Sequence, residues 1–312
     1  MIEERIKLRH LQCMLAVAQL GSVQKAAQAL AISQPAVSKT VTELEALLGV
    51  RLLERNRKGA ELTAAGAAFL RHAQHSVSAL KQAVASIAPG PQHSAPVVLG
   101  VLPTVAPSLV PKLIAQLDQR ADRMGLPAPR LRVYSQTNPE LLGQLRQGQL
   151  DLVIGRFAEP QVMRGLSFEH LYTDPLVLVV RRGHPLLRKR QADILTRLKG
   201  YRLILPLPGT AIRHATDALL AQQGAEEPPS TVETLSISLA RQQCLNSNAI
   251  WFTREGAITP DLEQQRLSRL PVQTGRTEEM IGLIQRADSR LSSAPLEVAK
   301  AIRSLGQRRP RA

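Results

Sequence analysis

Two consecutive stretches decide the fold of this chain: Ser22-Val-Gln-Lys-Ala-Ala-Gln-Ala-Leu30 and Ser33-Gln-Pro-Ala-Val-Ser-Lys-Thr-Val-Thr-Glu-Leu-Glu-Ala-Leu-Leu48. In the first stretch the apolar residues recur at the spacing of one helical face. Each stretch opens with serine, a favoured residue for capping a helix N-terminus. Pro35 stands in the first turn of the second stretch, where its missing N–H leaves no bond unmade. The two stretches therefore predict two helices joined by the short turn Ala31-Ile32.

A further helix is predicted before this pair, over Leu8–Leu20, because its apolar residues follow helical spacing and Gly21 can end it. A short helix, a tight turn and a longer helix form a helix-turn-helix, whose second helix reads the major groove of DNA. That second helix is expected to bury a stripe of aliphatic residues and to expose a polar face. The exposed side chains suited to base contacts are Gln34, Pro35, Ser38, Lys39 and Thr42.

Beyond Gly49 the sequence predicts a β-hairpin, because the short runs Leu52–Arg55 and Ala60–Thr63 flank a turn that contains Gly59. The basic residues of this hairpin are Arg55, Arg57 and Lys58. Most charged hairpin tips are only solvated, but one that directly follows a helix-turn-helix is suited to DNA phosphates or the minor groove. Residues 1–63 are therefore predicted to form a winged helix-turn-helix that binds duplex DNA.

These motifs resemble the N-terminus of the LysR-type transcriptional regulators. The match rests on Arg9-His10-Leu11, Gly21-Ser22, Ala26-Ala27, Leu30, Ser33 to Ser38, Leu44-Glu45, Leu48-Gly49, Leu52 to Arg55 and Leu62 to Gly66, in the family's order and spacing. Lys39 departs from the pattern, because many members have arginine there, and lysine lacks the planar fork that pairs with guanine. The resemblance implies a transcriptional regulator, for which RNA polymerase is an expected partner.

From Thr63 the sequence predicts a long helix over residues 64–88, followed by a proline-containing hinge at 89–96. Its apolar residues alternate steps of four and three, the seam of a coiled coil, and they are Phe69, Ala73, Val77, Leu80, Val84 and Ile87. The adjacent domain is expected to be too small to cover this helix, so pairing with a second chain is favoured over packing on its own domain. A homodimer predicts a pseudo-palindromic operator, and the resemblance implies a homotetramer.

Residues 97–308 alternate strand-like and helix-like runs, which predicts an α/β domain of parallel sheets covered by helices. The length fits two lobes, one formed by about 97–162 with 270–308 and the other by about 163–269. The resemblance implies a periplasmic-binding-protein-like effector domain, and Gly148–Gly155 and Gly183–Leu186 are its best-matching segments. Leu102-Pro103-Thr104 and Phe168–Tyr172 resemble regulators of aromatic-acid (protocatechuate-type) catabolism.

Ligands of such folds bind beyond the carboxyl ends of strands, near helix N-termini. The polar or glycine-containing positions that follow the predicted strands are Thr104, Thr137, Asn138, Pro208, Gly209 and Thr210, with Arg213 one turn later. Free helix N–H groups beside an arginine favour a small organic carboxylate as the effector. Helix capping is the competing interpretation for Thr104, Asn138 and Thr210, and Arg213 is alternatively a surface cation.

The composition limits the other functions. The net charge of +15 suits a polyanionic partner, but residues 1–88 hold only 11 of the 40 basic and 6 of the 25 acidic residues, so charge does not locate the DNA site. No apolar run approaches the ~20 residues of a membrane helix and no secretory signal opens the chain, so a cytoplasmic protein without a membrane partner is expected. Cys13 and Cys244 are interpreted as buried thiols rather than a redox pair, and the scattered histidines predict no metal site.

Two functions of other classes stay open. An enzyme fused to a DNA-binding module would show turnover, but the sequence contains no phosphate-binding glycine fingerprint and no nucleophile elbow, so no catalytic residue and no cofactor are predicted. An architectural DNA-binding protein would fit the high net charge. It would bind with little sequence preference, so a footprint confined to one dyad site would exclude it.

Overall fold

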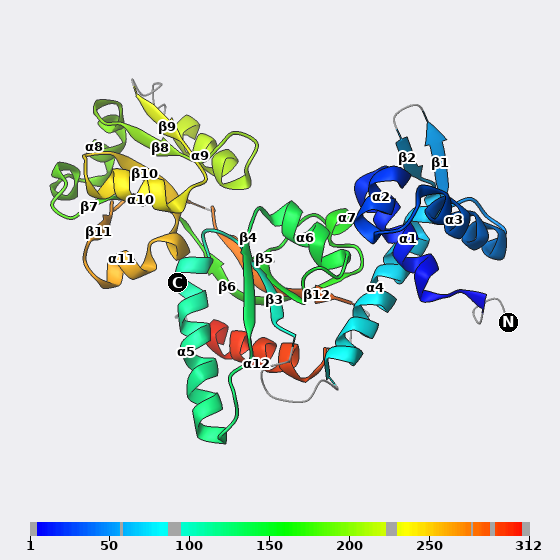
Figure 1. Cartoon of the computed structure of the whole chain (residues 1–312). Coiled ribbons are helices and arrows are strands. Elements are labelled where there is room, and N and C mark those ends of the chain that lie inside the picture. The colour runs from blue at the N-terminus through cyan, green and yellow to red at the C-terminus, as the bar shows by residue number, and fades with distance from the viewer. Residues whose placement is uncertain are drawn as a thin grey trace. The chain divides into compact units, whose positions relative to one another are not determined.

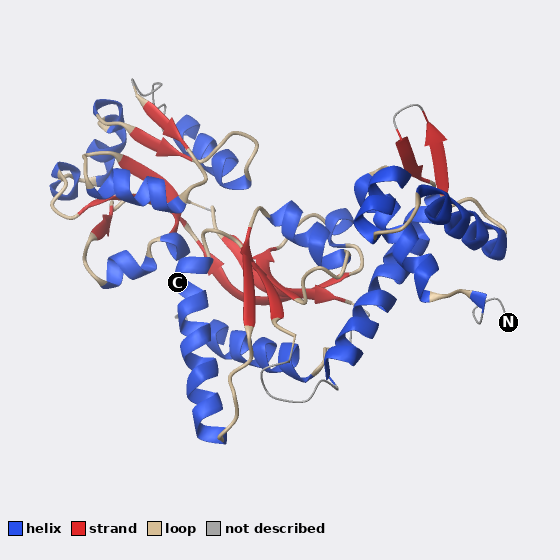
Figure 2. Cartoon of the chain, viewed as in Figure 1, coloured by secondary structure: helices blue, strands red, loops and turns tan. Residues whose placement is uncertain are grey.

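The computed structural model describes residues 5–56, 59–86, 95–222, 230–275, 277–287 and 291–307. The chain divides into two compact units, of which the first spans Met1–Ala95 and the second contains Pro96–Leu145 and Leu150–Ala312 (Figure 1). The first unit is helical apart from one hairpin, whereas strands and helices alternate in the second (Figure 2). These two architectures confirm the predicted fold class.

Three helices, α1 (Leu8–Leu20), α2 (Val23–Leu30) and α3 (Gln34–Leu48), surround the core of the first unit. The capping serines act as their sequence positions predict, because the Ser22 hydroxyl accepts a bond from the Lys25 N–H and the Ser33 hydroxyl from the Ala36 N–H. Gly21 ends α1 in the left-handed conformation. The fully buried core residues are Met14, Val17, Ala26, Val37 and Leu44. Local signals and the apolar pattern therefore agree on the helix-turn-helix.

The hairpin pairs β1 (Leu53–Asn56) with β2 (Gly59–Leu62) in antiparallel register. Its start is fixed to α3 by Glu45, whose Oε1 accepts bonds from the N–H groups of Leu52 (2.7 Å) and Leu53 (3.0 Å). Its end leads into Thr63, whose hydroxyl caps the following helix by accepting from the Gly66 N–H at 2.9 Å. The wing is therefore held at both ends.

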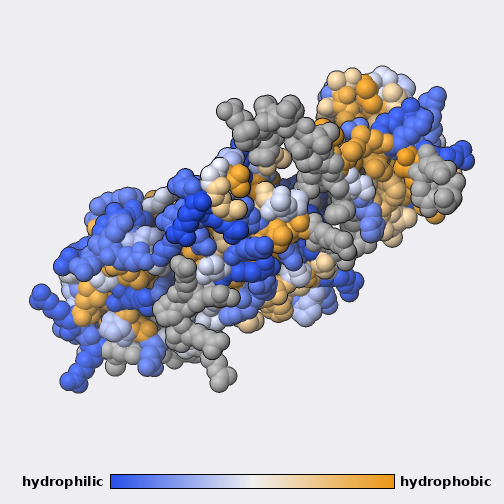
Figure 3. Space-filling view, turned by 90° about the horizontal axis from the view of Figure 1, so that it is seen from below, coloured by the Kyte–Doolittle hydropathy of each residue, from blue (hydrophilic) through white to orange (hydrophobic). Residues whose placement is uncertain are grey.

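The long helix α4 (Ala64–Ser86) uses its apolar seam in two ways. Ala73 and Val77 are buried within one copy of the chain, and Phe69 packs against the core of the first unit, so the expectation that the domain leaves this helix uncovered is wrong for this half. Leu80 and Val84 are 45% and 60% exposed. Ile87 lies outside the described residues. Figure 3 shows hydrophobic residues on the surface of the first unit. Of the seam residues that the structure describes, Leu80 and Val84 are therefore the ones open to a partner chain.

The first lobe of the second unit is built on a five-stranded sheet in the order β4-β3-β5-β12-β6. Its strands are β3 (Val97–Val101), β4 (Leu131–Ser135), β5 (Leu152–Arg156), β6 (Leu166–Asp174) and β12 (Glu279–Arg286). Its helices are α5 (Ala106–Met124), α6 (Asn138–Arg146), α7 (Pro160–Met163) and α12 (Ser293–Gln307). One continuous apolar core joins the strands to α5, α6 and α12.

The second lobe has its own five-stranded sheet, in the order β11-β7-β10-β8-β9. Its strands are β7 (Leu176–Arg181), β8 (Leu203–Leu205), β9 (Thr231–Glu233), β10 (Ile250–Arg254) and β11 (Leu267–Arg269). Its helical elements are η3 (Pro185–Arg188), α8 (Gln191–Thr196), η4 (Leu198–Gly200), α9 (Ala211–Gln222), α10 (Ile237–Leu245), η5 (Glu255–Ala257) and α11 (Thr259–Glu263). Both faces of β7 are buried, in two separate apolar clusters.

Two expectations about these sheets are wrong. The sequence predicts that the second lobe begins at about residue 163, but β6, which spans Leu166–Asp174, pairs with β12 in the sheet of the first lobe. The sheets are also not purely parallel, because β12 runs antiparallel to β5 and β6, and β7 runs antiparallel to β10 and β11. The chain passes from the first lobe to the second through Pro175, which alone separates β6 from β7, so the lobe boundary lies at 174–176 rather than at 163.

The close packing of α4 on the hairpin makes Gly66 essential for the first unit. A Cβ atom at Gly66 would lie 2.0 Å from the backbone oxygen of Leu52, which no side-chain movement relieves. We expect Gly66→Ala to destabilise the first unit by about 1–3 kcal/mol, the range for overpacked sites. Gly143→Ala is the matched control, because Gly143 lies inside α6 with nothing within 4 Å of its Cβ position. Calorimetry of the full chain compares them, and equal unfolding temperatures would contradict this prediction.

Candidate DNA-binding and effector-binding sites

The outward face of α3 carries the predicted base-contacting residues. Gln34, Pro35, Lys39 and Thr42 are exposed and Ser38 is half-buried, whereas Val37, Val41 and Leu44 on the opposite face are buried. This face has the shape that major-groove reading requires: a rigid helix with polar side chains directed away from its core. Of the hairpin residues, Arg55 lies in β1, and Arg57 and Lys58 lie outside the described residues, so their contact with DNA stays a prediction.

A hollow between α3 and the hairpin adds one basic residue that the sequence reasoning missed. It has a volume of about 630 Å³ and is lined by Ser38, Thr42, Glu45, Arg51 and Ala60, among others. Arg51 is exposed in the loop that joins α3 to β1. The sequence signal for Arg51 is its position between Gly49, which ends the helix, and the predicted wing. Arg51 is therefore a further candidate for a phosphate contact.

Glu43 adds a charged contact between α3 and α1 to the apolar core that they share. Its Oε2 lies 3.4 Å from the Arg9 guanidinium and 3.6 Å from Nε2 of His10. His10 is buried, and its Nδ1 accepts a bond from the Lys7 N–H at 3.0 Å. Because Glu43 and Glu45 leave α3 toward α1 and the hairpin, they position the helix without occupying its DNA-facing side.

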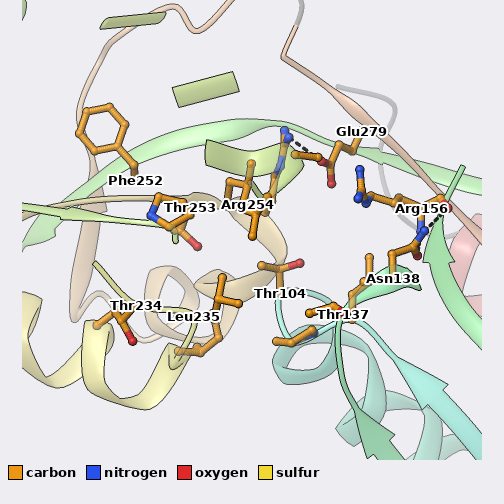
Figure 4. A pocket seen from close by; sticks show the side chains of 18 of the residues that line it. Thr104, Thr137, Asn138, Arg156, Thr234, Leu235, Phe252, Thr253, Arg254 and Glu279 are labelled. Carbon is orange, nitrogen blue, oxygen red and sulfur yellow. Dashed lines mark hydrogen bonds and ion pairs between the residues drawn. The ribbon is translucent and has the colours of Figure 1, made fainter. Parts of the chain in front are cut away.

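The second unit contains a cavity of about 320 Å³ between its two lobes. Several of its polar and charged lining residues stand at the carboxyl ends of strands: Thr104 follows β3, Arg156 ends β5, and Thr253 and Arg254 end β10, whereas Glu279 begins β12 (Figure 4). Its apolar lining residues are Leu102, Pro103, Pro139, Pro206, Ala211, Ile212, Leu235, Ile237, Ala240, Trp251 and Phe252. The volume lies at the lower end of the range for small-ligand sites.

Five of the seven predicted effector residues line this cavity: Thr104, Thr137, Asn138, Gly209 and Thr210. Most of their polar atoms have other roles. The Thr137 hydroxyl donates to Glu140 (2.6 Å), whose pKa this bond holds below its usual value, and the Thr210 hydroxyl donates to the Leu207 carbonyl (2.8 Å). The Asn138 amide bonds both the N–H (3.1 Å) and the carbonyl (3.2 Å) of Arg156. The polar atoms of these three side chains thus serve hydrogen bonds within the fold.

Thr104 differs from those three residues. Its hydroxyl has no hydrogen-bond partner within the part of the chain that the structure describes, and it lies at the centre of the cavity view (Figure 4). It is therefore the predicted hydroxyl that is most available to a ligand.

Arg213 and Pro208 do not line the cavity. The Arg213 guanidinium bonds Asp217 (2.7 Å), Glu233 (2.5 Å) and the Pro206 carbonyl (3.0 Å). These bonds, with that to Glu233 first, raise the pKa of Arg213. The prediction of Arg213 as an effector ligand is therefore contradicted, because its donors already serve two carboxylates of its own lobe.

Sequence reasoning missed the charged groups of the cavity, Arg156, Arg254 and Glu279. Both arginines end strands, so the rule that selected Thr104 would have found them. The guanidinium of Arg156 points toward Glu279 in Figure 4, yet it has no acceptor partner among the described residues. An arginine with unused donors at a cavity wall is a binding group for a carboxylate.

Arg254 has the opposite character, because it is 2% exposed and closely partnered. Its Nη1 donates to the carbonyls of Asp174 (3.2 Å) and Thr277, and its Nη2 contacts Glu279 at 2.8 Å. Burial lowers the pKa of Arg254, while Glu279 and Asp174 oppose that shift. Its Nε is buried without an acceptor among the described residues. Arg254 therefore holds Glu279 and the lobe junction through its two Nη groups, and burial keeps its remaining donor, Nε, from a ligand in the cavity.

Three further features of the described residues concern metal ligands, membrane helices and thiols. Among them, no three His, Cys, Asp or Glu side chains gather as metal ligands. Within the same ranges no helix is long and apolar enough to cross a membrane. Cys13 and Cys244 are buried free thiols, one in each unit.

Comparison with known families assigns both units. Residues 8–67 match the model "Bacterial regulatory helix-turn-helix protein, lysR family", and residues 91–306 match the model "LysR substrate binding domain". The second match alone spans more than half of the chain.

Individual relatives cover nearly the whole chain. The HTH-type transcriptional regulator PcaQ of Agrobacterium fabrum is 40% identical over 304 residues, covering 97% of this chain and 96% of PcaQ. The uncharacterized HTH-type transcriptional regulator YdcI of Escherichia coli K12 is also 40% identical over 304 residues, covering 97% of each. The structure of a full-length OxyR variant from Pseudomonas aeruginosa has a TM-score of 0.64 at 21% identity, covering 97% of this chain and 95% of OxyR, which supports the fold.

The α3 face predicts a base-specific defect for one glutamine. Gln34→Ala removes the side chain that can bond adenine bidentately, so we expect binding to lose about 1–3 kcal/mol at particular base pairs of a selected operator. Gln12→Ala is the control, because Gln12 is exposed on α1. Selection of bound DNA from random fragments compares the preferred sequences of the two variants and the wild type. An unchanged preference of Gln34→Ala would show that this placement of the recognition face is wrong.

Proposed function

The chain belongs to the LysR family of bacterial transcriptional regulators, and we propose that its DNA binding is controlled by a small organic carboxylate held in the cavity between the two lobes. The observation that carries this proposal is Arg156, whose guanidinium lines the cavity without an acceptor among the described residues. A carboxylate would take a bidentate pair of charge-assisted bonds from it. The Thr104 hydroxyl, which also lacks a partner within the described ranges, supplies a second polar contact for the same ligand.

The apolar walls support an acid with a hydrophobic or aromatic body. Leu102 and Ile237 face the cavity from the two lobes, and Trp251 and Phe252 contribute from β10. An apolar body against these walls and a carboxylate on Arg156 is the usual division of labour in small-ligand sites. The proposal therefore includes membership of the subgroup that regulates aromatic-acid catabolism. In this proposal the cavity binds such an acid as an effector and holds no cofactor.

The site also suggests how a ligand would change DNA binding. The cavity is lined by both lobes, and these are connected by the segment at Pro175 and by the segment that precedes β12. A ligand that contacts both lobes stabilises one angle between them over another. It shifts the equilibrium between these two conformations only by the difference in its affinity for them. We propose that this shift re-angles DNA-bound dimers on a pseudo-palindromic operator in the cytoplasm. Assembly into tetramers and contact with RNA polymerase belong to the same proposal.

A thiol-based redox signal is less consistent with the structure. A redox-sensing cysteine needs thiolate character and access to solvent. Cys244 is fully buried, and burial raises the pKa of its thiol to about 12. Cys13 is 3% exposed, and burial raises the pKa of its thiol as well. Ligand control therefore fits this chain better than oxidation of either cysteine.

Replacing Arg156 tests the proposed carboxylate site. We expect Arg156→Gln to weaken binding of every carboxylate that the wild type binds by about 10–100-fold, because a hydrogen bond to a charged group contributes about 1.5–3 kcal/mol. Arg213→Gln is the control, because its guanidinium is bound to Asp217 and Glu233 outside the cavity lining. Isothermal titration with a panel of aromatic and aliphatic monocarboxylates, repeated with operator DNA to record bending, makes the measurement. If no acid at millimolar concentration changed thermal stability or DNA bending of the wild type, the carboxylate proposal would be rejected.

A further inference from the structure

The sheet register places an acid beside the free arginine of the cavity. Arg156 in β5 pairs with Ile281 in β12, so Glu279, two residues before Ile281, lies on the same face of the sheet as its diagonal neighbour. Figure 4 shows the two side chains pointing toward one another at the cavity. Glu279 is 17% exposed and is held by Arg254 at 2.8 Å, so its carboxylate is fixed in place.

The charges of the lining determine what a ligand meets. Two arginines and one glutamate are the charged residues among those described around the cavity. Arg254 is committed to Glu279 and to two backbone carbonyls, which leaves Arg156 as the cation available to a ligand. One ligand carboxylate therefore finds a partner. A second carboxylate near Glu279 would meet like charge in a partly desolvated site, where such repulsion is strong.

We infer that Glu279 determines the specificity of this cavity, which selects a monocarboxylate with a hydroxyl or N–H donor facing Glu279 and rejects dicarboxylates. The inference rests on the proposed carboxylate site, because it assumes that the first carboxylate binds Arg156. A donor on the ligand would bond the free lone pairs of Glu279, whereas a second carboxylate there has no cation to pair with among the described residues of the lining.

Isosteric probes test charge separately from shape. Terephthalate and 4-carbamoylbenzoate have the same outline, but the second replaces one carboxylate by a neutral amide with N–H donors. Succinate and succinamate form the same pair on an aliphatic chain, and benzoate lacks the second group. In titrations of the full-length wild type near neutral pH, we expect the amide of at least one pair to bind at least about tenfold more tightly than its dicarboxylate, because placing like charges together costs several kcal/mol.

The variant Glu279→Gln removes the negative charge with little change of shape. We expect it to reduce the preference for the amide over the dicarboxylate about tenfold, because the repulsion that creates the preference is gone. Glu233→Gln is the matched control, because Glu233 also pairs with an arginine, Arg213, but lies outside the cavity lining. It should leave the preference unchanged. Circular dichroism and operator binding establish that each variant is folded.

The outcomes separate this inference from the proposed function. A wild type that binds dicarboxylates as tightly as their amides overturns the inference, even if Glu279→Gln fails to fold. A folded Glu279→Gln with the wild-type preference also overturns it. In both cases the carboxylate site itself still stands if Arg156→Gln weakens all the probes. Failure of the wild type to bind any probe at about 10 mM, a concentration that reveals even weak binding, overturns the carboxylate site and the inference together.

Discussion

The buried guanidinium of Arg254 is the interaction on which the two-lobed unit depends. It leaves the end of β10 in the second lobe and reaches the carbonyls of Asp174 and Thr277, which belong to the two segments that connect the lobes, as well as the carboxylate of Glu279. Glu279 and Asp174 stand opposite each other in the β12–β6 register, where two acids repel. A buried cation beside them offsets that repulsion, and the acids in turn stabilise its charge. The lobe junction and the charge of the cavity are therefore set by one group.

In the DNA-binding unit, acidic side chains rather than an arginine connect the neighbouring elements. Glu43 connects α3 to Arg9 and His10 of α1, and Glu45 binds the first N–H groups of the hairpin. Both carboxylates act sideways from α3, so its outward face keeps polar and basic side chains. DNA repels acids, and an acid on that outward face would weaken binding. Placing them at the helix flanks orients the helix and the wing without this cost.

Much of this structure could be predicted from the sequence, because the decisive signals there are local. Ser22, Ser33 and Gly21 specify helix ends through bonds to residues within four positions, and the helix-turn-helix follows from them. The errors concern distant partners. The position of β6 depends on β12, more than a hundred residues later, and the role of Arg213 depends on Glu233, which only folding brings near. Thr137 and Asn138 do line the cavity, but their bonds to Glu140 and Arg156 could not be read from spacing.

The excess of arginine and lysine in this chain explains why its charge alone identified no site. Several arginines of the second unit are tied to acids: Arg241 makes two bonds to Asp261 (2.7 and 2.6 Å), and Arg303 makes two to Glu169 (2.9 and 2.8 Å). Because a carboxylate lies against each of these guanidinium groups, the pair attracts an anionic ligand less strongly than a lone arginine would. Arg156 differs because Asn138 binds its backbone while its guanidinium keeps its donors. In a basic protein, the arginine that binds a ligand is therefore the one whose guanidinium has no acceptor within the fold. The fixed charge nearest to it, which here is Glu279, determines which ligands it selects.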